Sequence, residues 1–330
     1  MVTEAEKQAA PSSAQNPSDP IVYFDGALLP LSRATVSVAA HALHYGTGCF
    51  EGIRAYWNDD REELYVLKLD EHIDRFFRSC SVLRIKPPFS RSEMHELVLE
   101  VLQRNGFTSD VYIRPIAFKS SQTIKLTLTG LDDCFAIYAF PFGYYAHRDE
   151  GLRVCLSPWR RIDDNAIPAR AKVTGSYVNA SLASDDAVQA GYDEALMLSQ
   201  SGALSEASSS NVFLLRRARL ITPPVSENIL EGITRDAVMT LAREQLGLQV
   251  EERTVGRTEV YVADEMFLSG TGVQIEPVVS VDGRPIGSGA PGPITTRLQR
   301  IYADAVRNRT PAYSSWCTAV YGFSHSLARD

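Results

Sequence analysis

Lysine is scarce in this chain, and one lysine stands apart from the others. Only six of the 33 Lys and Arg residues are lysines, and Lys172 is the only lysine after Lys125. An imine requires a neutral amine, which a lysine can supply and an always-protonated arginine cannot. The alternative is an arginine-rich composition that left one lysine on the surface, and Lys172 taken alone favours that alternative. The residues around Lys172 in the sequence must therefore decide between an imine-forming lysine and a surface lysine.

Two segments provide those surroundings. Residues 170–177 read RAKVTGSY, and residues 205–211 read SEASSSN. Together they resemble the class IV aminotransferases, in which the lysine forms a Schiff base with pyridoxal 5'-phosphate. The resemblance implies that Lys172 is the catalytic residue that holds this cofactor, that Tyr177 contacts its ring hydroxyl and that Glu206 pairs with its pyridine nitrogen.

The role implied for Glu206 has a physical basis. An ionised carboxylate beside the pyridine nitrogen keeps that nitrogen protonated, and a protonated ring can absorb the charge of a carbanion. The alternative is a strand carboxylate that faces solvent, which is less expected in a Ser- and Asn-rich stretch between apolar strands.

A phosphate site is expected where residues 230–235 (LEGITR) open an amphipathic helix. Free N–H groups and the helix dipole at such a start favour an anion. The resemblance implies that Ile233, Thr234 and Thr271 contact the phosphate and that Arg75 neutralises it. Each residue alone could be structural, as helix-cap threonines and solvated helix arginines usually are, so the prediction depends on their joint occurrence in the family's order.

A substrate pocket is predicted from residues 41–56 (HALHYGTGCFEGIRAY), which resemble the N-terminal signature of branched-chain amino acid aminotransferases. A second motif of that group is matched by residues 112–115 (YIRP), which would organise the carboxylate end. The expected substrate-binding residues are Tyr45, Phe50, Gly52, Arg54, Tyr112, Arg114, Tyr145, Thr271 and Gly272. Ordinary core packing after a turn is the alternative for residues 41–56. His41 and His44 lack a third ligand nearby, so no metal site is predicted.

The resemblance implies transamination of L-leucine, L-isoleucine or L-valine with 2-oxoglutarate, in which freed Lys172 moves a proton from the substrate α-carbon. Departures from the branched-chain pattern at Thr174 and Ser176, in residues 207–210 and at Gly272 put the substrate range in doubt. An (R)-amine or D-amino acid aminotransferase of the same fold is therefore a rival. Aminodeoxychorismate lyase and a non-catalytic scaffold are more distant alternatives.

Two domains are expected to position these residues. Residues 1–20 are expected to form a flexible tail. Residues 21–145 are expected to form a small α+β domain, and residues 150–330 a larger β-rich α/β domain. The first contains a predicted hairpin over residues 21–29, a helix after Asp70 and a helix opened by the capping box of Ser90 and Glu93. In the second we predict frequent strands and two clear helices, over residues 234–246 and 295–306. The family resemblance places the cofactor between two α/β domains, the fold-type IV architecture.

The composition limits the partners. The net charge of -7 without a basic block argues against nucleic acid and anionic membranes, and no apolar run approaches the roughly 20 residues needed to cross a bilayer. Five scattered cysteines favour a reducing, cytoplasmic location. The resemblance also implies a homodimer or higher homo-oligomer in which a partner loop completes each pocket, and residues 124–128 (IKLTL) are the candidate loop.

Overall fold

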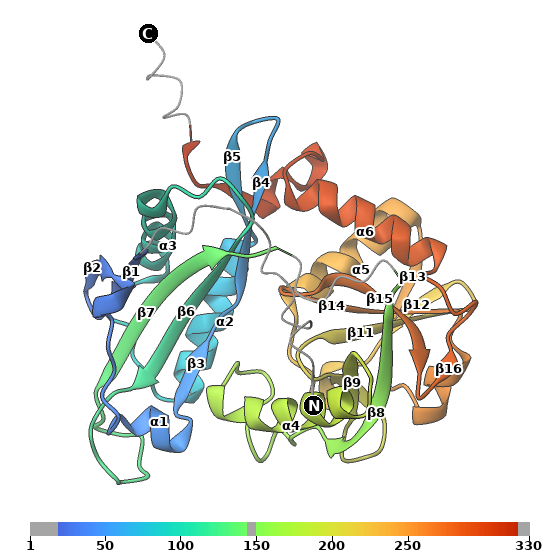
Figure 1. Cartoon of the computed structure of the whole chain (residues 1–330), viewed down its shortest axis with the longest axis horizontal. Coiled ribbons are helices and arrows are strands. Elements are labelled where there is room, and N and C mark those ends of the chain that lie inside the picture. The colour runs from blue at the N-terminus through green and yellow to red at the C-terminus, as the bar shows by residue number, and fades with distance from the viewer. Residues whose placement is uncertain (1–18, 144–149, 323–330) are drawn as a thin grey trace, which may run out of the picture.

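The computed structural model describes residues 19–143 and 150–322, which form two β-sheets with helices packed against them (Figure 1). The first sheet has the order β17-β5-β4-β6-β7-β1-β2, with β3 paired to β6. Its strands are β1 (Ile21–Phe24), β2 (Ala27–Pro30), β3 (Gly48–Phe50), β4 (Ile53–Asn58), β5 (Glu63–Leu67), β6 (Val111–Lys119), β7 (Asp133–Pro141) and β17 (Cys317–Ala319). The expected mixed α/β class is confirmed.

Two long helices cover the first sheet, and both were predicted. Helix α2 (Leu69–Val82) buries Ile73 and Phe76, while α3 (Arg91–Asn105) begins at the predicted capping box of Ser90 and Glu93. The short helix α1 (His41–Tyr45) precedes β3. The predicted hairpin also forms, because Asp25 and Gly26 both adopt the positive φ that a two-residue turn between β1 and β2 requires.

The second sheet has the order β10-β9-β8-β15-β14-β11-β12-β13, with β16 paired to β15. Its strands are β8 (Leu152–Arg160), β9 (Glu194–Leu198), β10 (Leu204–Ala207), β11 (Asn211–Arg216), β12 (Arg219–Thr222), β13 (Gln249–Glu252), β14 (Glu265–Gly270), β15 (Gln274–Val281) and β16 (Arg284–Pro285). The predicted helices correspond to α5 (Ile233–Leu246) and α6 (Pro293–Val306), which share one hydrophobic cluster with this sheet.

A third long helix, α4 (Tyr177–Gln189), was missed by the sequence analysis. Its buried positions are Ala180, Ala183 and Ala187, and the last two pack against Ala195 and Met197 of β9. Alanines give a weaker periodic signal than larger apolar residues, so this helix has little of the pattern that revealed the other helices.

The chain end returns to the first sheet. Strand β17 pairs with β5 through Cys317 and Leu67, so residues 317–319 belong to the first sheet although they lie inside the expected second domain of residues 150–330. The two units also share core contacts, since Tyr56 packs in the cluster that contains Phe213 and Tyr302. These contacts join the two units.

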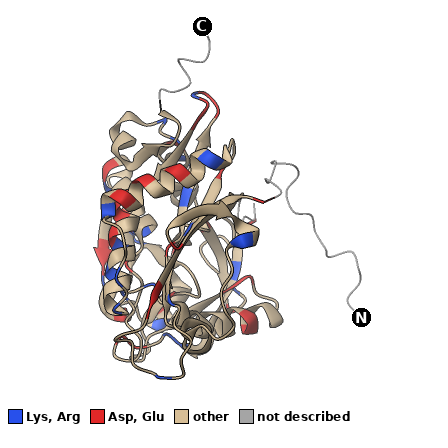
Figure 2. Cartoon of the chain, turned by 90° about the vertical axis from the view of Figure 1, so that its left-hand side faces the viewer, with Lys and Arg blue, Asp and Glu red and all other residues tan. Residues whose placement is uncertain are grey.

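Acidic and basic residues intermingle along the ribbon in the view of Figure 2. Among residues 19–143 and 150–322, no helix is long and apolar enough to cross a membrane. The same residues contain no cluster of metal-binding side chains. His41 contacts Thr47 and the carbonyl of Lys125, both at 2.8 Å, and His44 contacts the carbonyl of Val38 at 2.9 Å.

Candidate active site

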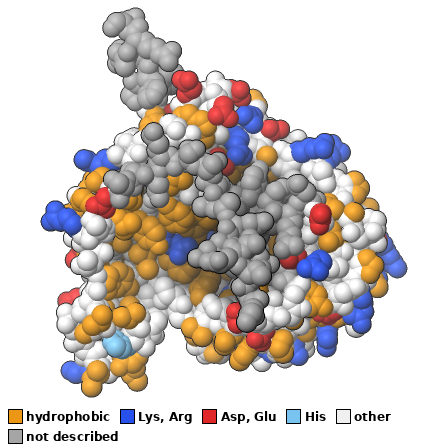
Figure 3. All heavy atoms as spheres, in the orientation of Figure 1, with side chains coloured by type: hydrophobic (Ala, Val, Ile, Leu, Met, Phe, Trp, Pro, Cys, Tyr) orange, Lys and Arg blue, Asp and Glu red, His pale blue; other side chains and the backbone are white. Residues whose placement is uncertain are grey.

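A cavity of about 1160 Å³ lies between the two sheets and is lined by residues of both units. Figure 3 shows hydrophobic side chains gathered at the hollow on this face. The predicted site residues that line the cavity are Phe50, Gly52, Arg75, Tyr112, Arg114, Lys172, Tyr177, Glu206, Ile233, Thr234, Thr271 and Gly272. Residues separated by more than 200 positions in the sequence thus meet in one cavity.

The amine of Lys172 lies at the centre of this arrangement. Its Nζ is 2.7 Å from the Tyr177 hydroxyl, at the start of α4, and 5.0 Å from the centroid of the Phe50 ring. The backbone of Lys172 is held on both sides, because its carbonyl accepts from the N–H of Phe50 at 3.1 Å and its N–H donates to Ser79 Oγ at 3.0 Å. The side chain is therefore presented from a fixed backbone.

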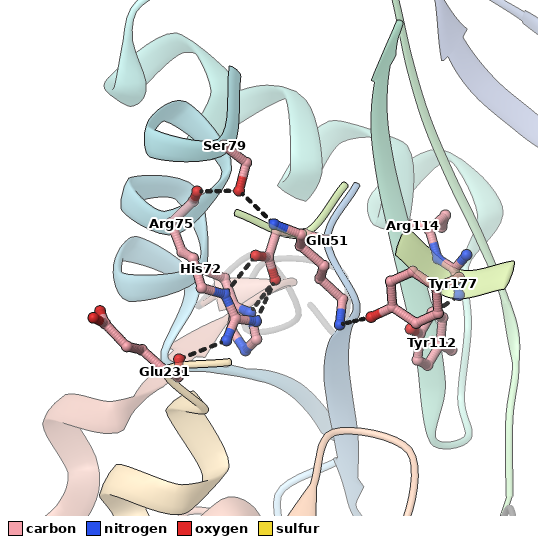
Figure 4. A network of polar contacts seen from close by, with 9 residues as sticks. Glu51, His72, Arg75, Ser79, Tyr112, Arg114, Tyr177 and Glu231 are labelled. Atoms are coloured by element: carbon pink, nitrogen blue, oxygen red, sulfur yellow. Dashed lines mark hydrogen bonds and ion pairs between the residues drawn. The ribbon is translucent and has the colours of Figure 1, made fainter. Parts of the chain in front are cut away.

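Arg75 of α2 belongs to a buried polar network (Figure 4). Its Nε and Nη2 donate to the two carboxylate oxygens of Glu51 at 2.7 and 2.8 Å, and its Nη1 donates to the carbonyl of Glu231 at 2.9 Å. The Nδ1 atom of His72 lies 2.8 Å from Glu51 Oε2. Ser79, one turn after Arg75, donates to the Arg75 carbonyl at 3.0 Å, so α2 contacts the lysine backbone and also carries the arginine.

The charge states within this network follow from its contacts. Burial alone would raise the pKa of Glu51, but Arg75 and His72 more than offset it, and the pKa lies below its usual range. Burial lowers the pKa of His72 against the opposing effect of Glu51, so its imidazole is neutral near pH 7. Since the ionised Glu51 carboxylate only accepts hydrogen bonds, His72 Nδ1 carries the donated proton.

Several groups that line the same cavity as Arg75 suit a phosphate. Helix α5 begins at Ile233 after the N-cap Gly232, which has no side chain to satisfy the free N–H groups of the first turn. The hydroxyls of Ser210 and Ser269 also line the cavity and are buried without a hydrogen-bond partner among the described residues. Buried hydroxyls without partners are costly, so these groups fit an oxygen-rich ligand.

Glu206 is fixed by three contacts at the end of β10. Its Oε1 lies 2.7 Å from Arg161 Nη2, and its Oε2 accepts from Asn211 Nδ2 at 2.9 Å and from the N–H of Leu230 at 3.2 Å. Burial raises the pKa of Glu206, and the Arg161 guanidinium limits that rise. Gly232 is required here, because a Cβ at this position would collide with Asn211 Oδ1.

Arg114 occupies another part of the cavity wall, with Tyr112 and Phe50. Its Nη2 donates to the Tyr112 hydroxyl at 3.1 Å, and its guanidinium lies 4.5 Å from the Phe50 ring centroid. The Nε of Arg114 is buried without a hydrogen-bond partner among the described residues. Gly52 makes room for this arrangement, because a Cβ there would collide with the Tyr112 hydroxyl. A cation beside aromatic rings whose Nε and other N–H groups are not all taken by the chain can receive a carboxylate.

Three predicted substrate residues are not placed in the cavity wall. Buried Arg54 donates to the carbonyls of Phe142 and Gly143 at 2.8 and 3.0 Å, where the chain leaves the first unit. Tyr45 is partly exposed, and its hydroxyl donates to the carbonyl of Ile124 at 3.4 Å. Neither lines the cavity among the described residues. Tyr145 lies outside the described residues.

Four residues that hold the predicted groups in place were not identified from the sequence. Glu51 and His72 contact Arg75 or each other, while Arg161 and Asn211 contact Glu206. Glu51 lies inside the motif of residues 41–56, where an acidic residue among apolar ones was a signal of a buried ion pair. Arg161 had no comparable signal, because its partner is 45 positions away in the sequence.

Comparison with known proteins places this geometry in a family. The family model "Amino-transferase class IV" matches residues 48–281. The chain is 44% identical to a probable branched-chain-amino-acid aminotransferase of Aquifex aeolicus, covering 91% of this chain and 96% of that protein. The crystal structure of a branched-chain aminotransferase from Thermoproteus uzoniensis with norvaline superimposes with a TM-score of 0.88 at 40% identity, covering 92% of this chain and 100% of the other.

A further solved structure contains a cofactor. It is the branched-chain amino acid aminotransferase from Thermobaculum terrenum in its PLP-form, the holo-form, with a TM-score of 0.88 and 38% identity over 92% of this chain and 98% of that one.

Proposed function

The chain belongs to the class IV aminotransferases, and we propose that it transfers the amino group of L-leucine, L-isoleucine or L-valine to 2-oxoglutarate. One observation carries the proposal: the Arg114 guanidinium, with its buried Nε unused, lies 4.5 Å from the Phe50 ring centroid in the same cavity as the Lys172 amine. A carboxylate and an apolar side chain can therefore be bound beside one reactive nitrogen.

Pyridoxal 5'-phosphate is the cofactor of this enzyme family, and when bound it accepts the substrate amino group and absorbs the electrons of the bond that is broken. We propose that Lys172 carries it and then acts as the base that removes the proton from the substrate α-carbon. The Tyr177 hydroxyl accepts a hydrogen bond from Nζ at 2.7 Å and so orients this amine.

The remaining predicted cofactor contacts are supported by the chemistry of the groups present. Arg75 and the start of α5 at Ile233 and Thr234 supply positive charge and N–H groups for a phosphate, with Thr271 as a further donor. Glu206, held by Arg161, supplies the carboxylate for the pyridine nitrogen. Arg75 and the start of α5 would hold the phosphate, and Glu206 of β10 would hold the ring nitrogen.

The substrate end combines charge with apolar walls. Arg114 and Tyr112 are proposed to bind the substrate carboxylate, with Gly272 as a further lining residue, while the Phe50 ring supplies an apolar wall for a branched aliphatic chain and Gly52 makes room for the Tyr112 hydroxyl. Arg54 acts on this end through the backbone, because it holds the carbonyls of Phe142 and Gly143.

The proposal is tested by offering the holoenzyme L-leucine, D-alanine and (R)-1-phenylethylamine separately, and following cofactor absorbance and the oxo product. We expect L-leucine to react fastest and to yield its 2-oxo acid, with glutamate formed when 2-oxoglutarate is added. A faster reaction with D-alanine or the (R)-amine would replace the branched-chain proposal with one of its rivals. A protein that takes up no cofactor would reject the aminotransferase itself.

We also propose that the working unit is a homodimer. Residues 124–128 are the proposed partner loop, and Ile124 and Leu126 are 89% and 74% exposed. The loop is anchored to α1, because the Lys125 carbonyl lies 2.8 Å from His41 Nε2 and the Ile124 carbonyl accepts from Tyr45. Because Tyr45 is bound to this loop, we propose that it contacts substrate in the partner's pocket together with the loop. Five free thiols support the cytoplasm as the compartment.

A further inference from the structure

Arg75 has a defined set of donors left for a ligand. A guanidinium carries five N–H groups, one on Nε and two on each terminal nitrogen. Glu51 takes one from Nε and one from Nη2, and the Glu231 carbonyl takes one from Nη1. One N–H therefore remains on each terminal nitrogen, and Arg75 lines the cavity. These two donors on adjacent nitrogens, called the Arg75 fork below, can each bind an oxygen of a phosphate.

The direction of the Arg75 fork is set by Glu51, which is itself held from two sides. Its backbone N–H donates to the carbonyl of Pro115 at 2.9 Å, and its carboxylate is 2.8 Å from His72 Nδ1. Its side chain is completely buried between β3 and β4. A carboxylate fixed in this way leaves the bidentate guanidinium one orientation instead of the several that a long, flexible side chain would otherwise sample.

The ordinary alternative is an ion pair that only supports the fold. A buried pair is weak evidence for stability, because the desolvation of both charges can exceed their attraction. Glu51 also places a negative charge beside an arginine that is proposed to bind an anion, which opposes binding unless orientation is the larger effect. We propose that Glu51, supported by His72, is a positioning residue that aims the two free N–H groups of Arg75 at the phosphate of the cofactor.

This inference rests on the proposed cofactor role of Arg75 and is tested on the full-length chain freed of cofactor. The affinities for pyridoxal 5'-phosphate and for pyridoxal, which lacks the phosphate, are measured by titration for Glu51→Gln, Arg75→Gln and the double variant. Glu51→Gln should weaken binding of the phosphate form about 10- to 100-fold, as for loss of charge-assisted hydrogen bonding, and leave pyridoxal binding almost unchanged. In the Arg75→Gln background it should have no further effect.

Asp74→Asn is the matched control. It removes one carboxylate from the neighbouring position of α2, where Asp74 is exposed and pairs with Arg91 on the surface, so its affinities should equal those of the wild type. If Glu51→Gln does not fold, Glu51→Asp replaces it, because it keeps the charge and withdraws the carboxylate by one methylene. The same phosphate-selective loss is expected.

The outcomes separate the two proposals. Equal weakening of both ligands by Glu51→Gln, unchanged affinities or tighter binding of the phosphate form would each overturn the positioning role. Arg75→Gln without a phosphate-selective loss would instead overturn the proposed cofactor role of Arg75, and the positioning role with it. A phosphate-selective loss in Glu51→Gln that disappears in the double variant supports both.

Discussion

Arg75 and Arg114 are two guanidinium groups that line the same cavity, and their surroundings differ (Figure 4). Arg75 has all three nitrogens in hydrogen bonds, to a buried carboxylate and a backbone carbonyl. Arg114 donates to the Tyr112 hydroxyl and has a buried Nε without a partner among the described residues. At the cofactor end, Arg75 is thus held in one orientation by a carboxylate and a carbonyl and keeps one N–H on each terminal nitrogen for its ligand, whereas at the substrate end Arg114 is held by a single hydroxyl among the described residues.

This difference has a functional reason. A cofactor stays through every turnover, so rigid pre-organised contacts favour its retention. Two different substrates must enter and leave in turn, and a cation with an unused donor binds each of them through the carboxylate they share. The comparison predicts that damage to the two ends will separate into effects on cofactor affinity and effects on substrate affinity.

The largest effect is expected at the Lys172 amine, which lies in the same cavity as Arg75 and Arg114. Lys172→Ala removes the group proposed to carry the cofactor and to move the α-proton, so the rate of amino transfer should fall by about 10⁴-fold or more. The phosphate end should persist, and cofactor affinity should still depend on the phosphate. Lys86→Ala, at an exposed lysine, is the control. Substantial transfer by the Lys172→Ala protein without an added amine would refute the assignment.

A smaller effect is expected at the substrate end. Arg114→Gln should raise KM for L-leucine and for 2-oxoglutarate about 10- to 100-fold, the usual size for loss of a charged hydrogen bond to a carboxylate. Steady-state kinetics and a cofactor titration measure the two quantities separately. The cofactor affinity should not change, and Arg104→Gln, at a surface arginine paired with Glu100, should change neither. A loss of cofactor affinity in Arg114→Gln would break the separation of the two ends.

The proposed partner loop, residues 124–128, gives a third test, which again concerns the substrate end. Ile124→Asp combined with Leu126→Asp would place two charges in an apolar contact, where their desolvation opposes association. Sedimentation should show monomers, and KM for L-leucine should rise while cofactor affinity changes less. Val262→Asp, a similar change at another exposed apolar position, is the control. A monomer with full activity would contradict the proposed role of the loop.

The sequence predicted short-range features better than the contacts that hold the site. The hairpin at Asp25-Gly26 and the capping box at Ser90 depend on neighbours within a few positions, and both were found. The fold class and the lining position of Lys172 followed from motifs that a family shares. Helix α4 was missed because its buried face is made of alanine.

The hydrogen bonds among Glu51, His72 and Arg75 could not be predicted from local sequence patterns. Glu51 and Arg75 are 24 positions apart, and no spacing rule connects a strand-end carboxylate to the middle of the next helix. Tyr45 and Arg54 show the converse limit, since a motif predicted residues near the pocket without distinguishing lining side chains from those that support neighbouring backbone. Contacts of this kind depend on tertiary packing, which the local pattern leaves undetermined.

The smallest expected effect concerns the pH dependence of stability at the cofactor end. The folded-state pKa of His72 is lowered by burial, so between that value and the ordinary histidine pKa of about 6.5 the unfolded chain binds a proton that the folded chain does not. Stability therefore rises with pH through this window and is fully present above it. His72→Gln removes one such proton, so the slope should fall by at most about 1.4 kcal/mol per pH unit.

Urea unfolding of the cofactor-free protein between pH 5 and pH 7.5 measures this slope. His95→Gln, on the outer face of α3 beside Asp70, is the control for loss of a histidine. Arg114→Gln should keep the wild-type slope, because the substrate end contains no neutral histidine held against a carboxylate among the described lining residues. An unchanged slope in His72→Gln would contradict the lowered pKa, and a steeper slope would mean that His72 is protonated beside Glu51. Glu51 would then face two cations, and the buried network would carry a net positive charge toward the phosphate.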